Sequence, residues 1–368
     1  MFLSHSILLD CGEGTLNQLL RVSGEGATIL SQIQVVLISH SHADHHLGLP
    51  LLLAQLAATT SESPHTEKRA KIVDSPPLLI IGPPRVRLFL EMWNTFIPSI
   101  MSMYSYLDIP VTGEVQNHDS ISLPSIRPMI PSVEITTETL SDGSFIVTIP
   151  DQKLTFKFFP VWIWDISNYQ IDHCDDSVSM LVHTSSFTLM YSGDGRPNER
   201  ARNFIPTEWC VDVLVNECTF SDDRQEQAKA KNHCTCSEAL SVGKKVNAKY
   251  TILTHFSQRY PKNLSHDQGM KETHHIVPND RVKWIYAHDL MEVSFNDLES
   301  ICLIRDELEA CFASDEEESS VYSKQITHAA IKPSLCLQQV KGSTHRTHSW
   351  LPLSRIPMLM NVMHTMSQ

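Results

Sequence analysis

The sequence lacks any apolar run that could cross a membrane. A transmembrane helix needs roughly 18 consecutive apolar residues, and no part of the 368-residue sequence supplies such a run. The amino-terminal segment MFLSHSILLDCGEG has neither the basic region nor the small-residue cleavage site of a secretory signal. We therefore expect an intracellular protein without a membrane-embedded part. Its 42% of apolar residues are enough to bury a large core.

The sequence also has no excess of positive charge. It contains 29 Lys and Arg residues against 42 Asp and Glu residues, which gives a formal net charge of −13. Nucleic-acid binding normally depends on Lys and Arg at the phosphates, so a polyanionic partner would have to be contacted through local basic clusters. Such a cluster is more often a solvated surface patch than a binding site. The candidates are Lys68 with Arg69 and Lys71, Arg85 with Arg87, and Lys244 with Lys245.

Paired cysteine motifs are almost absent. The nine cysteines are an odd number scattered along the chain, which favours a reducing compartment over a disulfide-bonded protein. Cys234 and Cys236 form a C-x-C motif, but a zinc site needs about four ligands and no second cysteine pair completes this one. We therefore do not expect a cysteine-rich metal site.

The sequence does contain short β-branched apolar runs that alternate with stretches of helical spacing. Such runs, bounded by turn residues, indicate buried strands, and the stretches between them indicate helices that cover sheets. The pattern predicts an α/β (α+β) fold. The expected strands cover residues 7–9, 34–38, 78–81, 187–191, 211–215 and 250–254, and the expected helices cover 47–57, 86–96 and 237–248, the last without a full capping box.

We expect one folded region followed by a tail. Residues 1–298 carry the alternating pattern, interrupted near 105–150 by a Ser-, Pro- and Thr-rich segment that we interpret as an irregular insertion. Residues 299–368 are first charged and Ser-rich and then His-, Met- and Pro-rich. Because that composition buries too little apolar surface to fold by itself, we expect a disordered tail.

A dense group of metal-ligand residues follows the expected strand 34–38. His40 and His42 are two residues apart, so their side chains project to the same side of an extended chain. Asp44 and His45 follow at the turn into the next helix, and imidazole and carboxylate groups suit Zn²⁺. A polar loop with ordinary histidines seldom combines these residue types at this spacing. The motif therefore predicts two adjacent metal sites.

Further ligand-type residues stand near the ends of later strands. They are His173, Asp194 and His255. A lone Asp after a strand is usually a turn residue, but beside a histidine cluster Asp194 can offer one oxygen to each of two cations. Two cations held about 3.5–4 Å apart can clamp the attacking and leaving oxygens of an in-line displacement. The sequence therefore predicts a two-metal hydrolase centre.

Together these motifs resemble the ribonuclease Z (tRNase Z) family, in particular the catalytic carboxyl-terminal half of its long eukaryotic form. The similar segments span residues from about 10 to 295, and ILTHFSQRY at 252–260 is the most family-specific of them. The other similar segments are LDCGEGT at 9–15, SHSHADHHLG at 39–48, GPP at 82–84, DHC at 172–174, SGD at 192–194, NECT at 216–219 and HCT at 233–235.

The resemblance implies a fold and a metal centre. The fold is the αββα sandwich of the metallo-β-lactamase superfamily, and the cofactor is a pair of Zn²⁺ ions. In the ligand sets that the resemblance implies, one ion is held by His40, His42 and His173, the other is held by Asp44, His45 and His255, and Asp194 bridges them.

The resemblance also implies an activity, the endonucleolytic removal of the 3′ trailer from precursor tRNA. Asp44 would orient or deprotonate the attacking water. His233 would protonate the leaving 3′ oxygen, a role that suits a histidine poised near neutral pH, although a histidine there can also be a surface or helix-capping residue. Glu217 would orient His233. By the same resemblance, the protein would work in the nucleus, in mitochondria or in both.

Alternatives to an active ribonuclease stay open. The chain begins without the strands that normally precede Asp10 in the family, and the long form has an additional amino-terminal half with the arm that grips tRNA. We therefore expect an N-terminally truncated fold that needs that half, or a second subunit, as a partner. The alternatives are an inactive fragment that only binds partners and a different two-zinc hydrolase of the same fold.

Overall fold

The computed structural model describes most of the chain between residues 6 and 308. The described residues are 6–21, 29–30, 32–61, 78–110, 134–150, 153–161, 174–198, 200–257, 283–308 and 358–359. Within these ranges no helix is both long and apolar enough to span a membrane.

The first sheet is parallel. Its four strands lie in chain order, namely β1 (Ser6–Leu9), β2 (Ile33–Leu37), β3 (Leu78–Gly82) and β4 (Tyr104–Asp108). All neighbouring strands run in the same direction, so their carboxyl ends share one edge of the sheet. Every residue of β3 is buried, as expected for a parallel strand that is covered on both faces.

The second sheet has eight strands and is partly parallel. In the order of the sheet, the strands are β12 (Lys283–Tyr286), β11 (Tyr250–Thr254), β10 (Val213–Glu217), β9 (Thr188–Tyr191), β8 (Val178–Thr184), β7 (Leu154–Pro160), β6 (Phe145–Ile149) and β5 (Thr136–Thr139). Neighbours from β5 to β9 are antiparallel, whereas neighbours from β9 to β12 are parallel. The carboxyl ends of β9, β10 and β11 therefore lie side by side.

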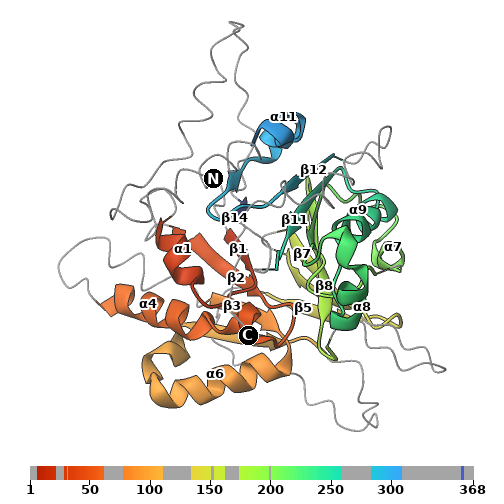
Figure 1. Cartoon of the computed structure of the whole chain (residues 1–368). Coiled ribbons are helices and arrows are strands. Elements are labelled where there is room, and N and C mark those ends of the chain that lie inside the picture. The colour runs from red at the N-terminus through yellow and green to blue at the C-terminus, as the bar shows by residue number, and fades with distance from the viewer. Residues whose placement is uncertain are drawn as a thin grey trace, which may run out of the picture.

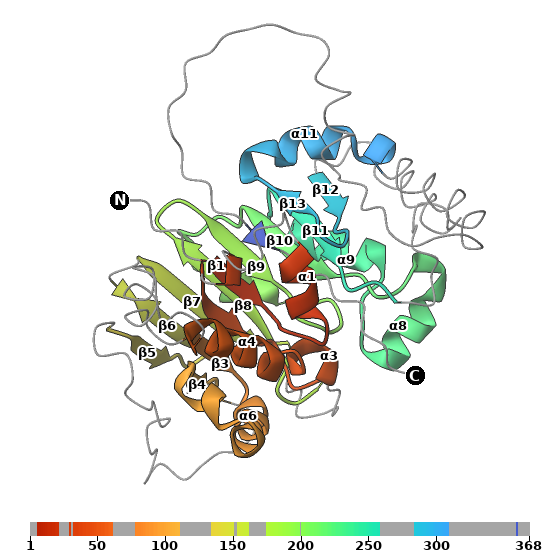
Figure 2. The ribbon, with the colours of Figure 1, turned by 90° about the vertical axis from the view of Figure 1, so that its left-hand side faces the viewer.

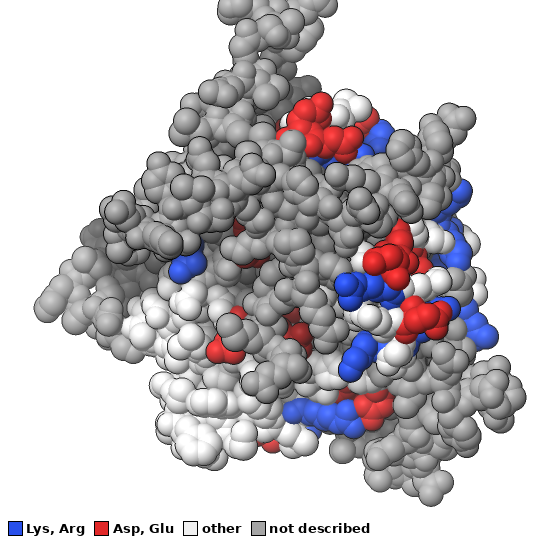
Figure 3. Space-filling model, in the orientation of Figure 1, with Lys and Arg blue, Asp and Glu red and all other residues white. Residues whose placement is uncertain are grey.

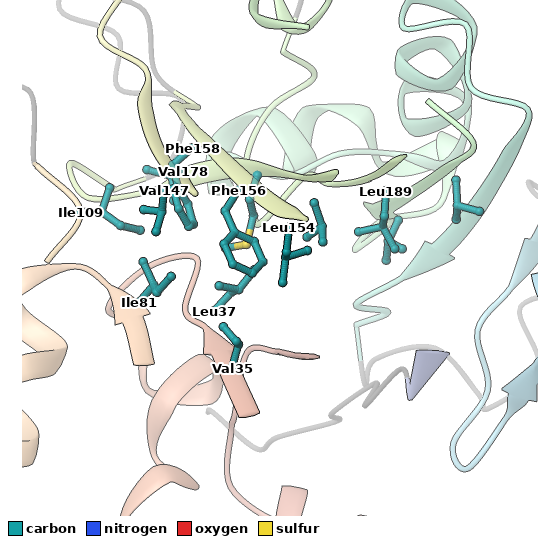
Figure 4. Packing of buried hydrophobic residues seen from close by; sticks show 14 of the residues in the cluster. Val35, Leu37, Ile81, Ile109, Val147, Leu154, Phe156, Phe158, Val178 and Leu189 are labelled. Carbon is teal, nitrogen blue, oxygen red and sulfur yellow. The ribbon is translucent and has the colours of Figure 1, made fainter. Parts of the chain in front are cut away.

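The two sheets face each other across the main hydrophobic core. Figure 4 shows Leu37 and Ile81 of the first sheet on one side of this core and Phe156 of the second sheet on the other. All three side chains are fully buried. Because burial of one such side chain contributes about 1.5–3 kcal/mol, this interface holds the two sheets and their strand ends in place.

Helices cover the outer face of each sheet, which gives four layers (Figures 1 and 2). On the first sheet lie α1 (Thr15–Arg21), α4 (Leu49–Ser61) and α6 (Pro84–Phe96), and Leu52 and Leu90 of these helices share a cluster with Val36 of β2. On the side of the second sheet lie α7 (Ala201–Phe204), α8 (Gln225–Lys231) and α9 (Cys236–Lys245), and Val242 of α9 shares a cluster with Leu214 of β10.

Short elements complete the described fold. They are α3 (Ala43–His46), η1 (Pro98–Ser102), η3 (Asp222–Arg224), η5 (Phe295–Asp297), α11 (Leu298–Leu303) and the antiparallel pair β13 (Glu292–Val293) and β14 (Met358–Leu359). Helix α11 begins at the predicted domain boundary, and its Leu298 is buried in the main core. The start of the predicted tail is therefore helical. Residues 309–357 lie outside the described residues, so the tail itself stays a prediction.

The α/β layers confirm the predicted fold class, and each expected strand and helix has a counterpart. Two details differ. Helix α9 does have a capping box, because the Thr235 hydroxyl accepts from the Glu238 backbone amide while the Glu238 carboxylate accepts from the Thr235 amide. The segment 105–150, expected to be irregular, includes β5 and β6, whose short apolar alternation is hard to detect between turn residues. Residues 111–133 of that segment lie outside the described residues.

Gly48 allows the histidine motif to approach the loop that follows β1. Its backbone amide donates to the Cys11 carbonyl oxygen at 2.9 Å. A Cβ atom on residue 48 would stand 2.0 Å from the Gly12 carbonyl oxygen and 3.0 Å from the Cys11 carbonyl oxygen. Because backbone atoms surround the position, no side-chain rotation relieves this contact.

We expect Gly48→Ala to lower the free energy of unfolding by about 1–3 kcal/mol through steric strain. Leu51→Ala, in helix α4 that follows Gly48, is the control, because Leu51 is 55% exposed and its truncation should cost no more than about 0.5 kcal/mol. Urea unfolding of the two variants measures both values. A Gly48→Ala variant as stable as the unchanged chain would contradict the close backbone approach.

Candidate metal centre

The candidate centre lies where strand ends of the two sheets meet. Residues 39–42 follow β2, Asp44 and His45 lie in α3, Asp194 comes shortly after β9, and His255 directly follows β11. A backbone hydrogen bond of 3.0 Å from the Val178 amide to the Ser39 carbonyl oxygen joins the two sheets here. Residues that are far apart in the sequence therefore share one small region.

Most of the predicted ligands converge in that region. Among the described residues, Asp44, His45 and His255 each bring one ligand atom within 4.8 Å of the others. His40, His45 and Asp194 form a second group by the same measure, and all three are buried.

Two predicted ligands need separate mention. His42 is exposed, but one of its ring nitrogens lies within 4.8 Å of ligand atoms of His40 and Cys174. His173 lies outside the described residues, so its part in the centre stays a prediction.

Asp194 lies among three imidazole rings. Its Oδ2 atom is 3.1 Å from Nε2 of His45, 3.1 Å from Nε2 of His255 and 4.0 Å from Nε2 of His40. The sharp turn before Asp194 is made by Gly193, which has a φ of +62° and whose Cβ, if present, would lie 2.8 Å from the Val178 carbonyl oxygen. A glycine is therefore required to direct Asp194 at the three rings.

The other ring nitrogens of these histidines donate hydrogen bonds away from Asp194. Nδ1–H of His45 donates to Asp10 Oδ2 at 2.7 Å, and Nδ1–H of His40 donates to Ser39 Oγ at 3.0 Å. The Ser39 hydroxyl in turn donates to Asp10 Oδ2 at 2.8 Å. A single buried carboxylate, Asp10, thus orients both histidines.

Thr219 orients His255 in the same way. Its hydroxyl donates to Glu217 Oε2 at 2.7 Å and accepts from Nδ1–H of His255 at 2.8 Å. With Nδ1 as the donor, a neutral imidazole carries its lone pair on Nε2, which is the nitrogen close to Asp194. Metal-binding histidines typically have this second hydrogen bond.

This donor set fits a divalent cation. The imidazole lone pairs and the carboxylate oxygens are all electron-rich and meet in one space, which a positive charge stabilises. Burial alone would lower the pKa of His45, but Asp194 and Asp10 raise it well above its ordinary value. Burial likewise opposes ionisation of Asp44, yet His255 and His45 lower its pKa to about 2. Asp44 is therefore a carboxylate, as a metal ligand must be.

Beside the centre, His233 is paired with Glu217 as the resemblance implied. Nδ1 of His233 lies 2.9 Å from Glu217 Oε1, and Glu217 is 1% exposed. Burial disfavours the charged forms, but Glu217 raises the pKa of His233 to about 9 and His233 lowers the pKa of Glu217. The His233 ring is stacked against that of His255 with centroids 5.5 Å apart, so His233 lies next to a predicted metal ligand.

Arg196 holds the segment that carries His233. Its guanidinium donates to the His233 carbonyl oxygen and to both carboxylate oxygens of Glu238. The Arg196 and Glu238 side chains are largely buried, and Glu238 also caps helix α9. The position of His233 is therefore fixed by its backbone as well as by its ring.

The sequence analysis assigned no role to Asp10, Thr219 or Arg196. For Asp10 a signal was available, because it lies in the LDCGEGT segment that resembles the family. Thr219 lies in the NECT segment that resembles the family. Arg196 offered no signal, because its partner Glu238 is 42 residues further along the chain.

The pair Cys234 and Cys236 takes no part in the centre. Both side chains are buried, and the Cys234 thiol donates to the Gly195 carbonyl oxygen at 3.1 Å. Neither cysteine belongs to a group of metal-type ligands in the described part of the chain. Both cysteines pack in a hydrophobic cluster with Cys218 and Leu253.

Comparison with known proteins extends this description. A family profile described as a beta-lactamase superfamily domain matches residues 5–90. The human protein named zinc phosphodiesterase ELAC protein 2 is 30% identical over 320 residues, which are 85% of this chain and 32% of that protein. The mitochondrial ribonuclease Z of Drosophila melanogaster is 30% identical over 322 residues, which are 85% of this chain and 34% of that protein. The chain spans about a third of the length of these relatives.

A solved structure has the same fold. The crystal structure of a long-form RNase Z from yeast matches with a TM-score of 0.59 at 24% identity, and the match covers 85% of this chain and 39% of that one. The resemblance predicted from the sequence is confirmed. Residues 5–90 thus match the beta-lactamase superfamily domain, the fold is that of the yeast RNase Z structure, and 85% of the chain is similar to proteins named zinc phosphodiesterase and ribonuclease Z.

Proposed function

We propose that this chain is the catalytic part of a zinc-dependent endoribonuclease that removes the 3′ trailer from precursor tRNA. The observation that carries the proposal is the His233–Glu217 pair beside the group around Asp194. A two-metal centre alone suits many hydrolases, whereas a proton donor beside it suits the departure of a poor leaving group such as a ribose oxygen. The names of the relatives, zinc phosphodiesterase and ribonuclease Z, support the same activity.

Two zinc ions would be held by the converging side chains. The proposed sets are His40 and His42 for one ion and Asp44, His45 and His255 for the other, with Asp194 shared. From the resemblance we add His173, which lies outside the described residues, to the first set. When bound, zinc supplies positive charge that polarises the phosphate and lowers the pKa of a water molecule.

Asp44 would orient the attacking water and accept its proton. Its Oδ2 atom is 3.7 Å from Nε2 of His45 and 3.7 Å from Nε2 of His255. The side chain is 35% exposed, unlike that of Asp194, which is 3% exposed. Asp44 is thus the carboxylate of the centre that substrate and water can reach.

His233 would protonate the departing 3′ oxygen. Because Nδ1 is bonded to Glu217, Nε2 is the nitrogen that gives its proton. The pKa of about 9 keeps the ring protonated at neutral pH. Glu217 would stay ionised and hold the ring in one orientation, which makes it a positioning residue.

Binding of tRNA would need groups beyond those described. Over the right-hand part of the face in Figure 3, Lys and Arg side chains alternate with Asp and Glu side chains. Two arginines of the predicted clusters are paired, Arg85 with Asp175 and Arg87 with Asp108. We therefore propose that an amino-terminal half or a second subunit supplies the remaining grip on tRNA.

The proposed location follows the relatives and the resemblance. The Drosophila relative is named as mitochondrial, which supports a mitochondrial location, and a nuclear location is proposed from the resemblance alone.

The direct test is cleavage of precursor tRNA by the zinc-loaded chain. We expect a tRNA with a 3′ hydroxyl and a trailer with a 5′ phosphate. Asp44→Ala should lower the rate by about 10²-fold or more, because it removes the group that accepts the proton of the water. Asp108→Ala, which removes a carboxylate paired with Arg87 instead, should leave the rate within a few-fold.

Other outcomes of this assay separate the alternatives. A zinc-loaded chain that cleaves a small phosphodiester but no precursor tRNA would be a different hydrolase of the same fold. A chain that binds zinc and cleaves neither would be an inactive fragment. Equal rates with and without the Asp44 carboxylate would contradict its proposed role.

A second test concerns the proton donor. His233→Ala should lower the single-turnover rate by about 10²–10⁴-fold without changing the zinc content. Most of the loss should disappear on a substrate whose scissile 3′ oxygen is replaced by sulfur, since a thiolate leaves without protonation. His183→Ala, at a histidine whose ring is stacked on Trp209, is the control. An equal loss on both substrates would show that His233 does not protonate the leaving atom.

A further inference from the structure

The loop after Asp194 is joined to the segment that carries His233. The Cys234 thiol donates to the Gly195 carbonyl oxygen at 3.1 Å, and the Gly195 amide donates to Glu217 Oε1 at 3.0 Å. That carboxylate oxygen is the one that lies 2.9 Å from Nδ1 of His233. The loop that carries a predicted metal ligand therefore also holds the carboxylate partner of His233.

Arg196, in the same loop, extends this connection to the backbone of His233. Its Nη1 atom donates to the His233 carbonyl oxygen and, at 2.8 Å, to Glu238 Oε2, while Nη2 donates to Glu238 Oε1. On the other side of the residue, the His233 amide donates to the Ala228 carbonyl oxygen of helix α8 at 2.9 Å. Because the peptide groups on both sides of His233 are bonded, the direction of its side chain is held relative to the loop.

Glu238 binds the guanidinium and caps the next helix. Its Oε2 atom also accepts from the Thr235 amide at 3.0 Å, as part of the capping box of α9. The side chains of Arg196 and Glu238 are 15% and 17% exposed. Since a carboxylate occupies the two-pronged end of the guanidinium, Arg196 is better suited to hold this segment than to bind a substrate phosphate.

We propose that Arg196, through its ion pair with Glu238, is a positioning residue that keeps His233 aligned for transfer of its proton to the leaving oxygen. This inference rests on the proposed function, in which His233 is the proton donor. Proton transfer requires donor and acceptor atoms about 2.6–3.2 Å apart. A displacement of about 1 Å can lower a rate by about 10²-fold, so the backbone of His233 has to be held as firmly as its ring.

The test measures single-turnover cleavage of precursor tRNA by the zinc-loaded chain at saturating substrate, in parallel with His233→Ala. We expect Arg196→Met to lower the rate by about 10–10²-fold without changing the zinc content. Most of this loss should disappear on the substrate with sulfur as the leaving atom. Arg196→Lys should restore little of the rate, because an ammonium group lacks the planar fork that bonds both carboxylate oxygens. Arg202→Met, which removes an arginine that donates to the Ile205 carbonyl oxygen, is the control and should stay within a few-fold.

A double variant separates positioning from a general effect on the fold. In the His233→Ala chain, the additional change Arg196→Met should lower the rate by no more than about 2-fold, since the group that Arg196 positions is already gone.

Several results would overturn the inference and leave the proposed function intact. They are a further loss of about 10-fold or more in the double variant, an equal loss on the oxygen and sulfur substrates in Arg196→Met, and a loss of zinc in Arg196→Met. In each case Arg196 would act on the metal centre or on the whole fold. A loss in His233→Ala that is the same on both substrates would instead contradict the proposed role of His233.

A second measurement does not depend on activity. Amide hydrogen exchange, followed by mass spectrometry, should become faster over residues 232–238 in Arg196→Met and stay unchanged over residues 39–45, because only the first segment loses hydrogen bonds to the guanidinium and its partner. Unchanged exchange over 232–238 would overturn the inference even in a chain that cleaves no precursor tRNA.

Discussion

The centre depends on one electrostatic constraint at Asp194. Its Oδ2 atom is 3.1 Å from Nε2 of both His45 and His255, and the Nδ1 atoms of these rings already donate to Asp10 and Thr219. Carboxylates and imidazole lone pairs that share one space need positive charge between them. A bound cation would supply this positive charge, and the proposed chemistry depends on it.

The fold meets this constraint by joining strand ends from two sheets. Residues after β2 supply the histidine motif, and residues after β9 and β11 supply Asp194 and His255. Gly48 brings the histidine motif close to the loop after β1, and Gly193 brings the segment before Asp194 close to Val178 and Ser39. Glu217 ends β10, which lies between β9 and β11, the strands that precede the predicted ligands Asp194 and His255. Glu217 therefore holds His233 next to the predicted metal ligands.

The sequence predicted the parts of the site that are local. His40, His42, Asp44 and His45 lie within six positions, so residue type and spacing were enough, and Asp194 was recognisable by its place after a strand. Contacts between distant segments were not predictable, such as the hydrogen bonds of Asp10, Thr219 and Arg196. Their partners are set by the packing of the two sheets and not by spacing.

The measurement that tests this account most directly is anomalous diffraction at the zinc absorption edge from crystals of the zinc-loaded chain. The account predicts two zinc peaks that share Asp194, one bounded by Asp44, His45 and His255 and the other by His40 and His42. A single peak away from Asp194, or no zinc among these side chains, would contradict it.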